Sequence, residues 1–516
     1  VVERNLRRVG RERPAAAYPG VLLLEIDGLS EASLRRALDA GVMPVLAAWQ
    51  QAGSHRIVGW ETDLSCQTGA AQAGILHGNN ADIPAFRWVE KENGNRVVSS
   101  NGPKDSVRIE QRISDGHGLL AGGSGASRAN LFSGDADDDL MVYSTLTSPG
   151  KFYKPSYYVF FANPYNFMRT LTLMVVEVVH EMRQRRRQIK QDIQPRVPEH
   201  RRGLYPLVRA AATVFLRDMA LYTLIGDVAR GRADAIYATF YGYDVVGHYS
   251  GVEDADSLAV LRQLDRAIGR IEGAVREARR PYQIVVLSDH GQSKGATFRQ
   301  RYGATLKDVV TALLPAAIKT HHELDTHEGW GHVGALVTEA VSSTGQAEGH
   351  VVGKALRELT RRRTRDGEVL VGPDYQLERD EQEGKHVAAE DAELIVLASG
   401  NLGLIYFTDW RERMTLEQLD AAFPHLIPGL VTHPGIGFVM VRSQQWGPLA
   451  IGPRGVNYLA AGRIEGEDPL AVFSAHLPAH LCRTDSFAHA PDILVNSFYD
   501  PQKDEGAAFE ELIGFH

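Results

Sequence analysis

The sequence has little cysteine and no long uncharged apolar run. Its two cysteines, Cys66 and Cys482, show no CxxC spacing, which argues against a metal site built from cysteine and leaves one disulfide between them open. The longest apolar stretch, residues 160–179, is interrupted by asparagine, arginine and glutamate. A membrane-spanning helix needs roughly 20 mainly apolar residues, so this stretch predicts an amphipathic helix instead.

The sequence also lacks an excess of positive charge. It has 56 Lys and Arg against 64 Asp and Glu, a formal net charge of -8, which argues against binding a nucleic-acid polymer. A small anionic substrate held by metal ions is compatible with this charge. The hydrophobic fraction of 44% and the charged fraction of 23% are typical of a soluble globular chain.

The beginning of the sequence carries neither a methionine nor an apolar signal core. We therefore expect a domain cut from a longer protein, in which flanking segments would provide any membrane association. A basic run, residues 183–190, ends the predicted amphipathic helix. It is most simply a solvated helix face, and the alternative is contact with anionic lipid.

Three short segments, residues 21–28, 236–244 and 284–291, each place an acidic residue where an apolar strand should end. Such runs are typical of strands buried on both faces, and helical patterns lie between them. We expect an α/β fold with a mostly parallel central sheet, helices on both faces and a large inserted cap. The expected organisation is a linker or opening helix at 1–18, a catalytic domain at 19–516, an insertion at about 79–232 and a charged loop at about 358–390.

The acidic residues at these strand ends are joined by two histidines. Asp27 follows the first strand, Asp244 and His248 follow the second, and Asp289 and His290 follow the third. Because ligands gather at the carboxyl ends of parallel strands, these side chains should converge on one crevice. Carboxylates and imidazoles are good ligands for zinc and similar ions, and five are too many for one tetrahedral ion. The set therefore predicts a pair of divalent metal ions.

A metal pair of this kind needs a nucleophile, and Thr68 is the first candidate. It lies in a polar turn just before a small-residue helix, where backbone N–H groups favour an anionic phosphoryl group. Ser65 and Cys66 compete for this role. The simpler interpretation of Thr68 is the N-cap of that helix.

Taken together, these motifs resemble the alkaline phosphatase superfamily, in particular its type I phosphodiesterase/nucleotide pyrophosphatase branch. The matching pieces occur in the order of the family. They are Ile26-Asp27-Gly28, Thr68 with Gly78, Asp244-x-x-Gly247-His248-x-x-Gly251, and Ser288-Asp289-His290-Gly291.

The resemblance implies two zinc ions and a ligand set. One ion would be held by Asp27, Thr68, Asp289 and His290, and the other by Asp244, His248 and a histidine from the C-terminal part. For that histidine we rank His516 first, His489 second and His433 third. Donors to the remaining phosphoryl oxygen would come from Asn79, Asn80 or Arg87, among which the sequence does not choose.

The resemblance also implies a two-step reaction. Thr68 would attack phosphorus and form a phosphothreonine, which water would then hydrolyse, so we expect a phosphodiesterase or nucleotide pyrophosphatase. The alternatives are a phosphoglycerol or phosphoethanolamine transferase, a phosphomonoesterase, or a metal-free pseudoenzyme that serves as a binding module. The expected substrate is a small-molecule or lipid-linked phosphoester, and the expected location is extracytoplasmic or membrane-anchored in a bacterium.

Overall fold

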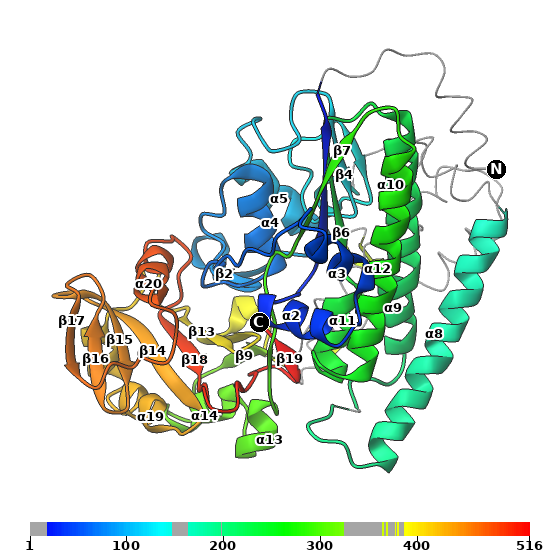
Figure 1. Ribbon diagram of the computed structural model, residues 1–516. Coiled ribbons are helices and arrows are strands. Elements are labelled where there is room, and N and C mark those ends of the chain that lie inside the picture. The colour runs from blue at the N-terminus through cyan, green and yellow to red at the C-terminus, as the bar shows by residue number, and fades with distance from the viewer. Residues whose placement is uncertain are drawn as a thin grey trace.

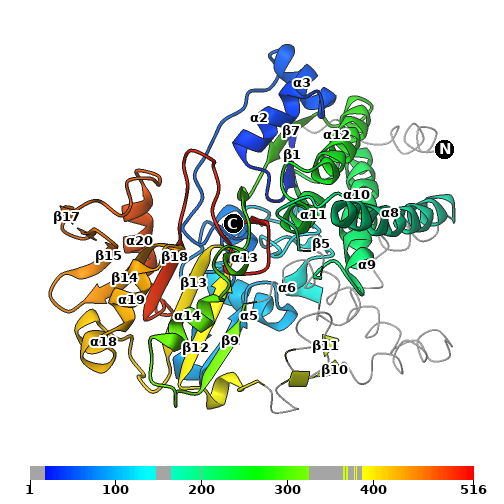
Figure 2. The same cartoon turned by 90° about the horizontal axis from the view of Figure 1, so that it is seen from below.

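The computed structural model describes residues 18–146, 164–197, 199–324 and 386–516, with a few short stretches between 364 and 380. A parallel sheet with helices on one side and a mixed layer on the other forms the body of the molecule (Figure 1). A second, larger sheet extends from that body, as the view from below shows (Figure 2). Both sheets border the region of the C-terminus.

The first sheet has five parallel strands in the order β5-β4-β6-β1-β7. Strand β1 lies between β6 and β7, so the three segments that the sequence predicts as acid-terminated strands are direct neighbours. This confirms the expected parallel sheet. The bounds are β1 (Gly20–Ile26), β4 (Gly125–Arg128), β5 (Asp138–Leu140), β6 (Ala235–Phe240) and β7 (Tyr282–Leu287).

The central strands are apolar because both of their faces are covered. Leu22, Leu24 and Ile26 of β1 pack into one core with the helices on the right of Figure 1, whereas Leu23 packs into the core on the opposite face. The helices that build the first core are α2 (Glu31–Asp39), α3 (Pro44–Gln51), α10 (Arg217–Arg230), α11 (Gly242–Ser250) and α12 (Ala255–Arg276). Ser30 caps α2 by accepting a hydrogen bond from the Ser33 backbone N–H at 3.1 Å, as its position before the helix predicts.

The opposite face of the parallel sheet meets two further helices and the second sheet. The helices are α4 (Thr68–His77) and α5 (Pro103–Ile113), with the hairpin β2 (Arg87–Glu90) and β3 (Arg96–Ser99) beside them. The second sheet has eight strands in the order β17-β16-β15-β14-β18-β13-β12-β9, and all its pairs are antiparallel except β12 with β9.

Strands β12 (Leu394–Ser399) and β13 (Leu402–Phe407) form the hairpin that their apolar pattern predicts. One face of this sheet joins the core of α4 and α5, and the other is covered by short helices. The remaining strands are β9 (Thr320–Glu323), β14 (Ile436–Ser443), β15 (Gly447–Gly452), β16 (Gly455–Tyr458), β17 (Arg463–Gly466) and β18 (Ile493–Ser497). The helices of this lobe are α13 (Phe298–Tyr302), α14 (Leu306–Ala312), α18 (Leu416–Ala422), α19 (Leu426–Thr432) and α20 (Leu477–Asp485).

The range 79–232, expected as an insertion, is not a simple addition beside the sheet. Strands β4 and β5 lie inside it and extend the parallel sheet past β6. The same range holds the long amphipathic helix α8 (Pro164–Lys190), which packs against α9 (Tyr205–Ala210). A π-helical segment, Ala211–Leu216, continues α9 into α10.

Other expectations fall partly outside the described residues. These include the expected linker at 1–18, of which only residue 18 is described, and most of the charged loop at 358–390. Cys66 and Cys482 are both free thiols, so the disulfide that the sequence left open is absent. Among the helices of the described residues, none is both long and apolar enough to cross a membrane.

Candidate metal centre

Three neighbouring strands deliver the acidic residues of the site. Asp27 follows the last residue of β1, Asp289 lies two residues after β7, and Asp244 stands in the first turn of α11, which follows β6. Because β6, β1 and β7 are adjacent and parallel, their carboxyl ends meet at one edge. The structure thus brings together the side chains that the sequence places at separate strand ends.

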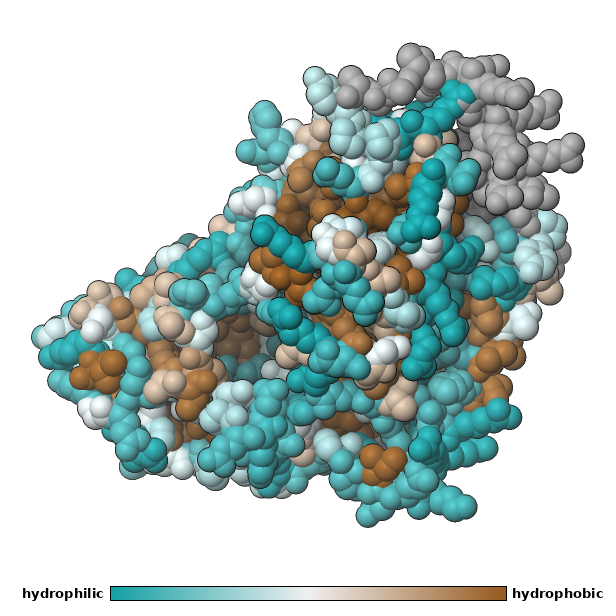
Figure 3. Space-filling view, viewed as in Figure 1, coloured by the Kyte–Doolittle hydropathy of each residue, from teal (hydrophilic) through white to brown (hydrophobic). Residues whose placement is uncertain are grey.

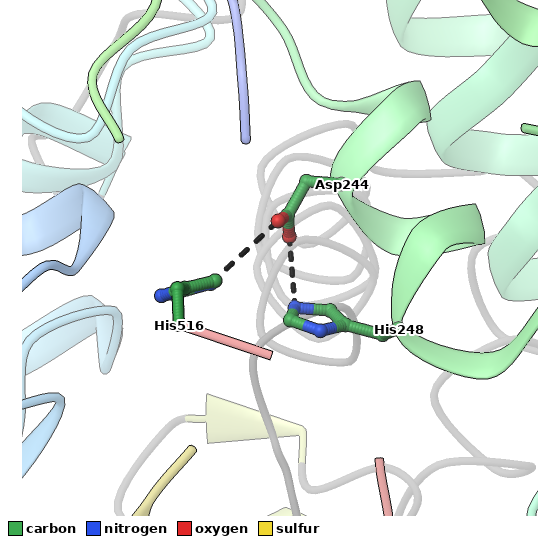
Figure 4. Close-up of side chains that lie close together, drawn as sticks. All are labelled: Asp244, His248 and His516. Atoms are coloured by element: carbon green, nitrogen blue, oxygen red, sulfur yellow. Dashed lines mark ion pairs between the residues drawn. The ribbon is translucent and has the colours of Figure 1, made fainter. Parts of the chain in front are cut away.

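Asp244, His248 and His516 form the first cluster, named here the Asp244 group (Figure 4). His248 Nε2 lies 2.9 Å from Asp244 Oδ2, and His516 Nε2 lies 3.6 Å from Asp244 Oδ1. Asp244 and His248 are one helical turn apart on α11, so both side chains face the same side. All three residues are buried.

His516 reaches this group through a short strand pairing. Strand β19 (Gly514–Phe515) pairs with β8 (Ser293–Lys294), which comes directly after the third acidic motif. The Ile513 backbone N–H also donates to the His248 carbonyl oxygen at 2.9 Å. These backbone contacts place the His516 ring 3.8 Å from the His290 ring, centroid to centroid.

Asp27, Asp289 and His290 form the second cluster, the Asp27 group. His290 Nε2 lies 3.4 Å from Asp27 Oδ1 and 3.4 Å from Asp289 Oδ2. The Thr68 hydroxyl joins this group, since its Oγ1 lies 3.1 Å from His290 Nε2 and 3.5 Å from Asp27 Oδ1. This group is buried as completely as the first.

The three histidines share one hydrogen-bonding pattern. Nδ1 of His248, His290 and His516 lies 2.8 Å, 3.1 Å and 2.7 Å, respectively, from a backbone carbonyl oxygen. A carbonyl oxygen only accepts, so Nδ1 carries the proton and donates in each case. Nε2 of each ring then faces carboxylate oxygens, which is the arrangement of a histidine metal ligand.

The donor set fits divalent metal ions. Three buried carboxylates lie against the Nε2 atoms of three buried imidazoles, and bound cations would compensate the negative charge of these carboxylates. In a tetrahedral zinc site, bonds of about 2.0–2.1 Å place neighbouring ligand atoms roughly 3.3–3.4 Å apart. The carboxylate-to-Nε2 distances of 2.9–3.6 Å bracket this spacing. Each group offers three protein ligands, which leaves a position for substrate or water.

Gly28 lies in close contact with one carboxylate of each group. It follows Asp27 with a left-handed backbone (φ +73°), and its N–H lies 3.3 Å from Asp289 Oδ1. A Cβ atom built on Gly28 would lie 2.6 Å from Asp244 Oδ1. The close approach explains why a glycine follows Asp27 after strand β1, because any larger residue would displace the Asp244 carboxylate.

Thr68 is the first residue of helix α4 and not its N-cap. The N-cap is Gln67, which makes no side-chain capping bond. The backbone N–H groups of Thr68 and the next two residues lie in the first turn, where they have no intrahelical acceptor. The threonine hydroxyl is therefore directed to the Asp27 group while the positive end of the helix faces the same space.

Glu25 holds helix α4 in place through buried hydrogen bonds. Its Oε1 accepts hydrogen bonds from Gln72 Nε2 at 2.6 Å and Thr239 Oγ1 at 3.0 Å, and its Oε2 accepts one from the Tyr237 hydroxyl. Gln72 lies one turn after Thr68 on α4. Complete burial, followed by the charge of Asp289, raises the pKa of Glu25 to about 8 although these hydrogen bonds lower it.

The other histidines considered for the Asp244 group lie elsewhere. His489 is paired with Asp82 and Glu92, and His433 packs against the rings of Phe298 and Tyr302. The geometry therefore brings His516, and neither rival, to Asp244 and His248.

The side chains expected to hold the remaining phosphoryl oxygen have other partners. Asn79 Nδ2 donates to a backbone carbonyl at 3.3 Å, and Asn80 Nδ2 donates to Asp63 at 3.2 Å. Arg87 is buried and forms ion pairs with Glu323 at 3.0 Å and with Glu510 at 2.7 Å. A role for Asn79, Asn80 or Arg87 in substrate binding stays a prediction.

Gln292 is a polar residue of the site that the motifs did not reveal. Its Nε2 donates to the Asp244 backbone oxygen at 3.1 Å and also to Asp244 Oδ1. It thereby orients the carboxylate between the two histidines. Gln292 stands directly after His290-Gly291, so its position beside the third motif was the available signal.

A parallel sheet that presents two buried groups of carboxylates and imidazoles beside a hydroxyl is an arrangement of metal-dependent hydrolases. Residues 21–413 match the model of the type I phosphodiesterase/nucleotide pyrophosphatase family, and the chain belongs to this family. The protein is accordingly a hydrolase that acts on phosphoric ester bonds, and the Asp27 and Asp244 groups are its candidate metal-binding residues.

Solved structures of other proteins are similar at low identity. Phosphonoacetate hydrolase from Sinorhizobium meliloti 1021 in complex with phosphonoformate is 13% identical, with 97% of this chain and 87% of that chain covered and a TM-score of 0.40. Wild-type alkaline phosphatase PafA is 11% identical, with 96% and 88% covered and a TM-score of 0.43. Among curated protein sequences, none matches the chain significantly.

Proposed function

We propose that this protein is a phosphodiesterase that uses two zinc ions and the Thr68 hydroxyl as its nucleophile. The observation that carries the proposal is the position of Thr68 Oγ1, 3.1 Å from His290 Nε2 and next to two buried three-ligand groups. Asp27, Asp289 and His290 would hold one ion together with Thr68. Asp244, His248 and His516 would hold the other.

Bound zinc would supply Lewis acidity that lowers the pKa of the hydroxyl and neutralises charge on the phosphoryl oxygens. The residues of the chain perform the remaining tasks. The carbonyl oxygens at the three Nδ1 atoms fix the imidazole rings, and Gln292 fixes the Asp244 carboxylate. These contacts hold the ligands in one geometry before substrate arrives, as electrostatic catalysis requires.

Thr68 would act in two steps. The Thr68 hydroxyl gives its proton to solvent as its oxygen forms a bond to phosphorus, while the bond to the leaving alcohol breaks and the leaving oxygen takes a proton from solvent. Water then attacks the phosphothreonine, which releases the phosphomonoester and restores the hydroxyl. The N–H groups in the first turn of α4 favour the anionic phosphoryl group during both steps.

The contacts of Arg87 favour a diester over a monoester substrate. A dianionic monoester is best bound by a bidentate arginine, and Arg87 is the arginine that the sequence offered for this role. Its guanidinium is instead paired with Glu323 and Glu510. A small-molecule or lipid-linked diester is therefore the proposed substrate, and an extracytoplasmic location in a bacterium stays a prediction.

Replacement of Thr68 tests the proposal. We expect Thr68→Ala to lower turnover of bis-p-nitrophenyl phosphate at least about a thousandfold, while zinc content measured by mass spectrometry stays near two ions per chain. Thr68→Ser is the matched control, because it keeps the hydroxyl and should retain activity.

Two results would contradict the proposal. Turnover retained in Thr68→Ala would assign the nucleophile to Ser65 or Cys66. Faster turnover of p-nitrophenyl phosphate than of the diester by the zinc-loaded wild type would assign a monoesterase.

A further inference from the structure

Helix α8 carries an exposed apolar stripe along its whole length. Seven large apolar side chains of this helix are at least 41% exposed, and Tyr165, Val175 and Val176 are more than half exposed. At about 1.5 Å per residue the helix is roughly 40 Å long, so the stripe is extended and not a local patch. The full set is Tyr165, Met168, Leu171, Val175, Val176, Met182 and Ile189.

The stripe faces away from the other residues that the structure describes. Met168, Val175, Met182 and Ile189 recur every seven residues, which places them on one side of a helix. The opposite side of α8 packs on α9. In Figure 3, brown side chains alternate with teal ones along the edge where Figure 1 places α8. A monomeric soluble protein rarely leaves so long an apolar surface exposed without a partner.

The acidic residues of α8 are turned inward. The helix contains two, Glu177 and Glu181, and both are buried. Arg209 Nε lies 2.7 Å from Glu177, and Arg201 Nε lies 2.6 Å from Glu181, so buried arginines of the next segment neutralise both carboxylates. The outward face of α8 consequently carries no negative charge.

The outward face does carry positive charge at its C-terminal end. Arg183, Arg186, Arg187 and Lys190 are exposed there. No acid among the residues that the structure describes pairs with Arg183, Arg186 or Lys190. The chain as a whole has a net charge of -8, so the positive charge on this apolar face is opposite in sign to the net charge of the molecule.

We propose that α8 is a docking surface for an anionic lipid bilayer. An amphipathic helix that lies in a membrane interface has apolar residues on one side and Lys and Arg beside them, which is the composition of this face. The apolar stripe would enter the boundary between headgroups and acyl chains, and the four cations would contact anionic headgroups. The phosphodiester site would then work close to a membrane surface.

A second copy of this chain fits the same face less well. Two α8 helices packed against each other would bury eight cations in total with no carboxylate from either outward face to pair with them. An anionic bilayer provides both the apolar layer and the negative charge. Charge complementarity therefore favours lipid as the partner.

Vesicle co-flotation tests this proposal with the full chain. We expect wild type to float with vesicles of phosphatidylcholine that contain roughly one third phosphatidylglycerol, and to float poorly with phosphatidylcholine alone or at high salt. Val175→Glu and Arg186→Glu should each lower the bound fraction at least about tenfold. Ile464→Glu on β17 and Arg411→Glu are matched controls at exposed positions of the other lobe, and should bind as wild type does.

Each contrary outcome overturns the proposal. Equal binding to both kinds of vesicle, or to neither, excludes recognition of anionic lipid, and wild-type binding by Val175→Glu and Arg186→Glu excludes α8. A dimer that Val175→Glu dissociates in sedimentation, without vesicle binding by wild type, would assign the face to a second copy. Circular dichroism melting establishes that all four variants fold, independently of activity.

Discussion

Gly28 offers a sharp test of the site geometry, because it holds no ligand atom of its own. Its backbone is left-handed (φ +73°), which costs a residue with a Cβ atom about 1–2 kcal/mol. The Gly28→Ala methyl would also lie 2.6 Å from Asp244 Oδ1. The carboxylate must then move by roughly 0.5–1 Å to restore an ordinary nonbonded contact.

That displacement should affect the Asp244 group more than the fold. Asp244 Oδ1 faces His516 and Asp244 Oδ2 faces His248, so a shift of this size removes the carboxylate from both imidazoles. A misplacement near 1 Å costs up to about a hundredfold in rate, and we expect that loss in kcat/KM for bis-p-nitrophenyl phosphate. Zinc titration should show one of the two ions weakened.

Gly41→Ala separates the two effects. Gly41 has nearly the same backbone angle (φ +66°), but a Cβ atom there would meet nothing within 4 Å. This variant should lose a similar free energy of unfolding in urea, about 1–2 kcal/mol, and keep wild-type activity. Activity of Gly28→Ala within about twofold of Gly41→Ala would refute the claim that Asp244 is held in place against Gly28.

Two further predictions concern metal binding and pH. Asp289→Asn should lower zinc content and diester turnover together, since it removes a charge from the Asp27 group; turnover that survives full metal loss would rule out the two-ion mechanism. Burial lowers the pKa of His489, but its hydrogen bonds with Asp82 and Glu92 outweigh this and raise it to about 9, above the ordinary 6.5. The raised pKa contributes stability that is complete below pH 6.5 and is lost as pH rises through about 9. His489→Gln should therefore cost about 1–2 kcal/mol in urea unfolding near pH 6 and almost nothing near pH 10, and an equal cost at both would contradict the assignment.

The elements that the sequence predicts correctly are those with a local physical signal. Buried parallel strands are continuous apolar runs, and the acids that end them stand out because carboxylates are rare in such surroundings. The order in which β6, β1 and β7 lie side by side follows from the preference for burying such apolar strands at the centre of a sheet. Asp27, Asp244 and Asp289 can thus be grouped from the sequence alone.

The antiparallel sheet combines hairpins of consecutive strands with pairings between strands that are distant in sequence, and the distant pairings are hidden from the sequence. Strand β13 pairs with β18, close to ninety residues later along the chain, and β18 also pairs with β14. No local periodicity indicates which of these strands are partners. The position of His516 is equally hard to predict from local sequence, because it depends on a pairing of only two residues between β19 and β8.

Asn80 and Arg87 are polar side chains whose partners come from elsewhere in the chain. Asn80 is held by Asp63 and Arg483, and Arg87 by Glu323 and Glu510. The sequence shows that such side chains are near the nucleophile helix but not that distant charges already satisfy them.

The contact between the two sheets explains why the site needs the second one. Gln67, the N-cap of α4, donates from Nε2 to Ser399 Oγ at 2.9 Å and to the His516 carbonyl oxygen at 3.3 Å. Ser399 ends β12, and its Oγ also accepts a hydrogen bond from the Phe86 backbone N–H at 3.0 Å. The end of strand β12 therefore fixes both the start of helix α4 and, through Gln67, the segment that carries His516. The parallel sheet supplies the carboxylates, and the antiparallel sheet sets the positions of Thr68 and His516 relative to them.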